Sequence, residues 1–226
     1  MSRFFVLSLC LLFLTTSTVR ADDEKAPQTP EVRAMHQLMD SKKVWSKIGK
    51  KSQWHIKNGY VVEDMNDLSP VKQGEGRISE TLYDSKIALL KAQKFLGVVH
   101  CAEWRVEGPG EGLLKTWFTI KIRVYKSEEE QKRAQKSESN LAKMLEGSTK
   151  RRGKRTTVVG RGVSIFEDRH SIEVSAIQRE PKRHLQVADV IHREFKKLVK
   201  EEEKVDAKRK KEEEKRQRDR DEKSVP

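Results

Sequence analysis

Apolar residues recur along this chain with two different periods, and these periods predict its secondary structure. Spacings of three and four residues predict amphipathic helices over residues 31–51, 79–96, 127–147 and 183–205. Alternation of apolar and polar residues predicts two hairpins, over residues 98–125 and 156–177. A turn and a short strand at residues 58–62 complete the predicted elements.

Local signals mark where the predicted helices begin and end. Ser79 has the N-cap character that starts a helix, and Gly97 stands where glycine usually ends one. Ser127 is followed by three glutamates, which form a capping box and place negative charge at the positive end of the next helix. These signals support the helix limits that the apolar spacing gives.

The order of the elements predicts the fold. A first helix and a short strand precede a helix-strand-strand unit that occurs twice, and a last helix closes the chain. We expect an α+β fold in which an antiparallel sheet of hairpins is covered by helices on one face. A long, highly charged C-terminal helix is expected to follow the second hairpin.

Domain organisation follows from changes in composition. Residues 1–21 combine a positive start with an apolar run too short to span a membrane as a helix, which predicts a secretory signal peptide cleaved before Asp22. Residues 22–30 are predicted to be a flexible leader and residues 31–205 a single α+β domain. Residues 206–226 are predicted to be a charged tail, either helical or disordered. The predicted location is extracytoplasmic, either periplasmic or secreted, after removal of residues 1–21.

The charge balance suggests what kind of partner to expect. The chain has 48 lysines and arginines against 35 aspartates and glutamates, a formal net charge of +13. Most of this excess lies before the C-terminal helix. A basic extracytoplasmic protein is suited to an anionic membrane surface, an acidic glycan or an acidic protein partner.

One cluster of cations is the candidate binding site. It contains five positive side chains within six residues, between the third predicted helix and the second hairpin. An irregular loop of this kind can reach phosphate or sulfate groups, and the absence of interleaved aromatic residues argues against specific nucleic-acid recognition. The candidate anion-binding residues are Lys150, Arg151, Arg152, Lys154 and Arg155.

The sequence offers no clear catalytic or metal-binding set. The six histidines, at 36, 55, 100, 170, 184 and 192, lack the spacing of metal ligands. We therefore expect no metal, no cofactor and no enzymatic activity. The alternatives are a hydrolase of an envelope polymer that uses Glu103, Glu107 or His170, and an assembly component joined through Cys101, the single cysteine that follows the predicted signal peptide.

A short segment resembles a known family. Gly74-Glu75-Gly76, followed by Asp84 through Ala88, Ala92 and Leu96 at four-residue spacing, resembles the glycine-then-alanine-rich helix of LPP20-type and SIMPL-type bacterial envelope domains. The resemblance covers residues 74–97. It implies a small α+β envelope module without a catalytic set.

Overall fold

The computed structural model describes most of the chain after residue 27. The described residues are 28–40, 44, 55–68, 70–73, 80–107, 117–146, 150–152, 156–159, 162–176 and 181–223. Their helices are α1 (Pro30–Asp40), α3 (Glu80–Phe95), α4 (Glu128–Glu146) and α5 (Pro181–Lys223). Their strands are β1 (His55–Val62), β2 (Pro70–Gln73), β3 (Val98–Glu107), β4 (Trp117–Tyr125), β5 (Lys150–Arg152), β6 (Thr156–Val159), β7 (Gly162–Glu167) and β8 (His170–Ser175).

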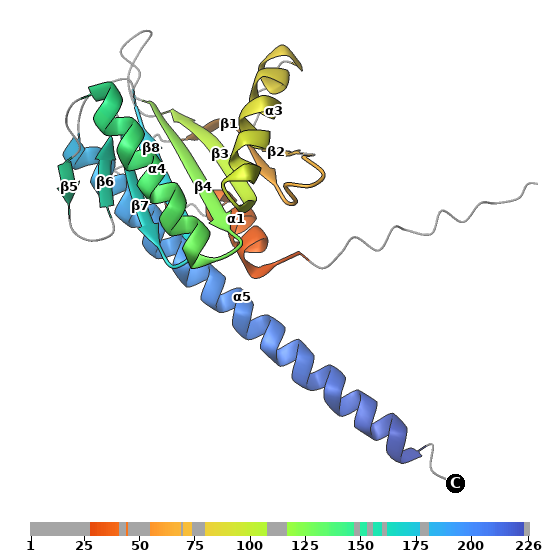
Figure 1. Ribbon diagram of the computed structural model, residues 1–226. Coiled ribbons are helices and arrows are strands. Elements are labelled where there is room, and N and C mark those ends of the chain that lie inside the picture. Colours follow the sequence, from red (N-terminus) through yellow and green to blue (C-terminus); the bar gives the residue numbers. More distant parts are fainter. Residues whose placement is uncertain are drawn as a thin grey trace, which may run out of the picture.

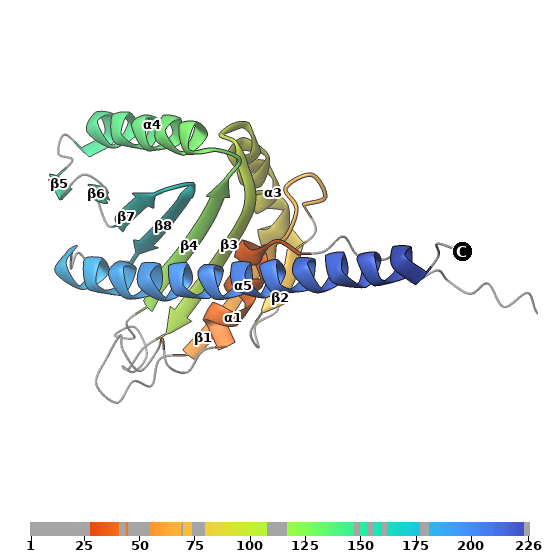
Figure 2. The ribbon, with the colours of Figure 1, turned by 90° about the horizontal axis from the view of Figure 1, so that it is seen from below.

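All described strands join one antiparallel sheet, in the order β2-β1-β3-β4-β8-β7-β6-β5. After β4 the chain crosses through α4 to the far edge at β5, and three antiparallel steps return it to β8 beside β4. Helices α1 and α5 lie on one face of the sheet, whereas α3 and α4 lie on the other (Figures 1 and 2). The predicted α+β class, antiparallel sheet and long C-terminal helix are confirmed, but the expectation that helices cover only one face is wrong.

The main hydrophobic core lies between the sheet and helices α1 and α5. Alternate residues of β3 and β4 point into it, from Ala102 to Val106 and from Phe118 to Val124, as alternation in a strand requires. Trp104, Ile120 and Ile122 have no exposed surface, and Phe195 on α5 is equally buried. Each buried side chain of this size contributes about 1.5–3 kcal/mol relative to exposure, so α5 is an integral part of the domain.

The opposite face of the sheet combines a small apolar cluster with buried ion pairs. Leu90 of α3 and Ala134 of α4 belong to the apolar cluster. Arg123 on β4 pairs with Glu173 on β8 at 2.8 Å and with Glu138 on α4 at 3.2 Å, while only 11% of its side chain is exposed. This ionic cluster explains why the second covered face was missed, because charged residues at alternate strand positions suggest contact with solvent.

The second helix-strand-strand unit contains more strands than the sequence suggested. The segment expected as one strand over residues 156–166 consists of β6 and β7, which pair antiparallel with each other. Strand β5 adds a further edge, so α4 is followed by four strands where a single hairpin was expected. The first unit, α3-β3-β4, has the expected order.

Helix α3 begins and ends as predicted, but it buries less than its apolar spacing suggested. It ends in front of Gly97, whose φ of +80° lies in the left-handed region that glycine tolerates. Leu90 is 1% exposed, whereas Phe95 is 94% exposed. The described part of α3 therefore packs through a narrow contact with the sheet.

The predicted leader at residues 22–30 is attached to the fold at its described end. The Gln28 side chain donates a hydrogen bond to Glu63, 2.7 Å away, and Pro30 already belongs to α1. Residues 22–27 and the predicted signal peptide at 1–21 lie outside the described residues.

Helix α5 passes the predicted domain limit at residue 205 without a break. Its contacts with α1 extend to Asp206, which pairs with Arg33 at 2.7 Å, and Arg33 also binds Glu202. Residues 207–221 are exposed, and the helix projects beyond the sheet as a straight arm (Figures 1 and 2). Of the two alternatives for the tail, the helical one holds up to Lys223.

Candidate anion-binding site

The candidate site lies where the β7–β8 hairpin meets α5. Glu167 is the last residue of β7. Because side chains alternate along a strand, it lies on the same face of the sheet as Val163 and Ile165, which face α5. The turn that follows contains Asp168, with a φ of 52° in the left-handed region. This geometry places a carboxylate at the sheet end next to the helix.

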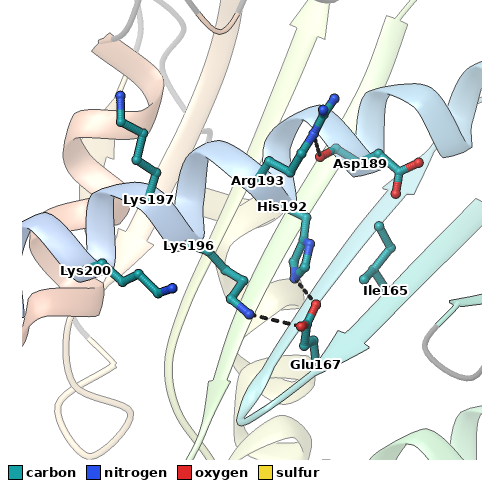
Figure 3. Close-up of a pocket in the computed structure, with 8 residues that line it drawn as sticks. All are labelled: Ile165, Glu167, Asp189, His192, Arg193, Lys196, Lys197 and Lys200. Carbon is teal, nitrogen blue, oxygen red and sulfur yellow. Dashed lines mark hydrogen bonds and ion pairs between the residues drawn. The ribbon is translucent and has the colours of Figure 1, made fainter.

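Two residues of α5, one helical turn apart, bind that carboxylate. His192 Nε2 lies 3.0 Å from Oε2 of Glu167, and Lys196 Nζ lies 3.0 Å from Oε1 (Figure 3). Lys196 also contacts Asp168 at 3.2 Å. Hydrogen bonding to Glu167 is the main reason that the pKa of Lys196 is raised, so this lysine stays positively charged. The negative charge of Glu167 is thus held by α5 itself.

A groove of about 740 Å³ opens beside these pairs, lined by side chains of β7 and α5 (Figure 3). Besides Lys196, its cations are Arg193, Lys197 and Lys200, all of which are exposed. Its other acid is Asp189, whose backbone carbonyl accepts a 3.3 Å hydrogen bond from Arg193. Glu167 is already bound by His192 and Lys196, so its negative charge does not offset the three exposed cations. These cations give the groove a positively charged rim.

A second histidine lies behind this groove and is neutral at physiological pH. His170, at the start of β8, is 8% exposed and packs edge-on against Phe195, with ring centroids 5.3 Å apart. Burial lowers the pKa of His170 to about 4. It therefore contributes packing to the α5 contact and no positive charge to the groove.

The structure separates the predicted cationic cluster from this groove. Lys150, Arg151 and Arg152 form the edge strand β5 and pair with β6, so they do not lie in the irregular loop that we expected. Strand β5 is separated from β7 by β6. Lys154 and Arg155 lie outside the described residues. Sequence reasoning missed the groove, since Glu167 and His192 are far apart in the chain and only the fold joins them.

The residues of the hydrolase alternative do not form one site. Glu103 on β3 lies on the α3 side of the sheet, where it accepts hydrogen bonds from Tyr60 and Lys86. His170 lies on the α5 side, against Phe195. Glu107 is buried at the end of β3, four residues from Glu103.

The assembly alternative needs a reactive thiol at Cys101. This side chain is 3% exposed, and its Sγ contacts Sδ of Met65 at 3.7 Å. Burial raises the pKa of the thiol to about 12, so the reactive thiolate is scarce at neutral pH. In the folded state the thiol does not reach the surface that an intermolecular disulfide requires.

Comparisons with protein-family models, with curated proteins and with solved structures find no significant match for this chain. The resemblance of residues 74–97 to LPP20-type and SIMPL-type domains therefore stays a prediction. Among the described residues, no helix has the length and apolar character needed to cross a bilayer, and no group of three or more His, Cys, Asp or Glu side chains is placed to hold a metal ion.

Proposed function

We propose that this protein is an extracytoplasmic, non-enzymatic module that binds an anionic component of the cell envelope through its basic surface. The observation that carries this proposal is the rim of the α5 groove, where Arg193, Lys197 and Lys200 are exposed beside a carboxylate that is already paired. The net charge of +13 and the predicted signal peptide support the same function.

The proposed mechanism is charge attraction. Arginine and lysine side chains form charge-assisted hydrogen bonds with phosphate, sulfate and carboxylate groups, and salt screens the attraction between exposed charges. Glu167 supports the site by holding His192 and Lys196 against the hairpin, which keeps the helix face with the three cations turned outward.

The test is binding of residues 22–226 to anionic vesicles, neutral vesicles and an acidic glycan across a salt series. We expect binding to the anionic probes at low salt, with loss of affinity as salt rises. A variant with glutamine at Arg193, Lys197 and Lys200 is expected to bind more weakly. No binding of the wild-type protein to any anionic probe at low salt would overturn the proposal and favour an acidic protein partner.

A second variant tests the cluster that the sequence singled out. It replaces Lys150, Arg151, Arg152, Lys154 and Arg155 with serine. If only this variant loses binding, the anionic component binds at the β5 edge of the sheet and not at the α5 groove. If both variants lose part of the affinity, both basic surfaces contribute.

A further inference from the structure

The exposed cations of the groove continue along α5 as a regular row. From Arg193 onward, a lysine or arginine recurs every three or four residues, which is the period of an α-helix. At about 100° per residue, all members of the row fall within a sector of about 80° of the helix surface. This cationic stripe consists of the eight exposed residues Arg193, Lys197, Lys200, Lys204, Lys208, Lys211, Lys215 and Arg218.

The stripe faces away from the domain. The residues of α5 that enter the core, among them Ile191, Phe195 and Val199, lie on the opposite side of the helix. The contacts with α1 through Glu202 and Asp206 also lie on that side. At a rise of about 1.5 Å per residue the stripe is about 38 Å long, and successive charges are about 5.4 Å apart along the axis.

Acidic residues border the stripe on both sides along the arm. By the same helical geometry, Glu201, Glu212 and Asp219 lie along one border, and Glu203, Glu214 and Asp221 lie along the other. Two ion pairs, Lys197 with Glu201 at 3.7 Å and Lys208 with Glu212 at 3.8 Å, join the stripe to one border. Exposed pairs of this kind contribute little, so the stripe keeps its charge for a ligand.

We propose that the cationic stripe binds a linear polyanion, an acidic polysaccharide with a negative group on successive sugar rings. This inference rests on the proposed function and names its ligand class. A row one side chain wide matches a single anionic chain, and its mean spacing of one helical turn is similar to the length of one sugar ring. The acidic borders repel a ligand that is wider than the row.

Two other polyanions fit less well. A flat anionic membrane would meet the acidic borders together with the stripe, and interfacial helices normally insert an apolar face that the stripe lacks. Single-stranded nucleic acid is usually held by aromatic side chains that stack on its bases, and α5 contains no aromatic residue after Phe195. The glycan therefore has the best complementarity of charge and shape.

The test compares two variants that each lose four charges from the same stretch of the arm. The stripe variant replaces Lys208, Lys211, Lys215 and Arg218 with glutamine. The matched control replaces the off-stripe cations Arg209, Lys210, Arg216 and Arg220 with glutamine. All eight positions are exposed, and glutamine is about as good a helix former as lysine, which circular dichroism can confirm.

The probe is heparin, a linear sulfated polysaccharide, with anionic vesicles in parallel. We expect the stripe variant to lose about tenfold or more in affinity for heparin and the control to lose less than about twofold. The plot of log affinity against log salt should become shallower by about 3 in the stripe variant only, as for four lost contacts with a single-stranded polyanion. For the wild-type protein, affinity should rise with heparin fragment length until the fragment is about as long as the stripe.

The outcomes separate this inference from the proposed function. Equal losses of heparin affinity in both variants, or no dependence of affinity on fragment length, would overturn the inference that the cationic stripe is the binding site. Binding would then be a general effect of positive charge. Binding to vesicles without binding to heparin would also overturn the stripe, although the proposed function would stand. Failure of the wild-type protein to bind any anionic probe would overturn both.

Discussion

Replacing Arg123 with methionine should strongly destabilise the protein, because it removes the buried cation that Glu173 and Glu138 share and leaves Glu173 with its longer pair to Lys121, at 3.7 Å. Arg123 is 11% exposed, and its partners Glu173 and Glu138 are 22% and 29% exposed. Removal of one partner from a buried ion pair costs about 3–5 kcal/mol. Since the carboxylates keep some contact with water, we expect a loss near the lower end, about 3 kcal/mol in the free energy of unfolding.

The assay is urea unfolding at pH 7, followed by tryptophan fluorescence, to which the buried Trp104 contributes. A loss of 3 kcal/mol is a large part of the 5–15 kcal/mol that typically stabilises a domain. The matched control is Lys132→Met, which removes the exposed pair of Lys132 with Glu128 and should cost less than about 0.5 kcal/mol. An Arg123→Met protein as stable as wild type at pH 7 would refute the reasoning.

The pH dependence gives a second check on Arg123. Burial alone would raise the pKa of Glu173, but Arg123 and Lys121 lower it below its ordinary value of 4.5. The stabilisation from this pair is therefore present above pH 4.5 and is lost as the pH falls through the lowered pKa. Glu138, the other partner of Arg123, has a pKa that burial raises above 4.5. The stability difference between wild type and Arg123→Met should therefore be largest at pH 7, begin to shrink above pH 4.5 as Glu138 is protonated, and shrink further below pH 4.5 as Glu173 is protonated. A constant difference down to pH 3 would contradict the ionic explanation.

Two further predictions concern buried positions. A Cβ at Gly59 would lie 2.3 Å from Cδ1 of Trp104, so Gly59→Ala should lower the free energy of unfolding, measured by thermal unfolding, by about 2 kcal/mol. The control is Gly162→Ala, whose Cβ would have its nearest contact at 3.3 Å and which should cost less than about 1 kcal/mol. Equal costs would show that the contact with Trp104 relaxes freely. Cys101 should react with a thiol reagent only after urea is added, and the protein should run as a monomer without reductant; rapid labelling of the folded protein would contradict its burial.

The sequence predicted most elements of the fold because their apolar spacing is regular and their ends carry clear signals. Gly97 ends α3 as predicted, and β3 and β4 form the expected hairpin. The covered second face could not be predicted, because Arg123 and Glu173 have the pattern of solvent-facing residues and only the tertiary structure places them under helices. The division between β6 and β7 was missed although the sequence contains a signal for it, because Gly160-Arg161-Gly162 separates the apolar residues of the two strands and was interpreted as a bulge within one strand.

The candidate site also has one part that the sequence could not predict and one part that it contains. Pairing of Glu167 with His192 depends on how α5 crosses the hairpin, and no local pattern contains that information. The row of cations along α5 is different, since its spacing of three and four residues is present in the sequence. Apolar periodicity and opposite-charge pairs do not reveal this row, whereas the period of the positive charges alone does.

The packing of α1 against α5 has a consequence for the order in which this chain folds. Met35 and Leu38 of α1 are fully buried in the same core cluster as Val199 of α5, although more than 160 residues separate them. During synthesis from the N-terminus, these apolar side chains therefore cannot be buried by α5 until almost the whole chain has emerged. The β-hairpins consist of local contacts and can form early, whereas closure of the core is the slow, long-range step. Until that step is complete, the nascent protein exposes the very surface that makes partially folded chains aggregate.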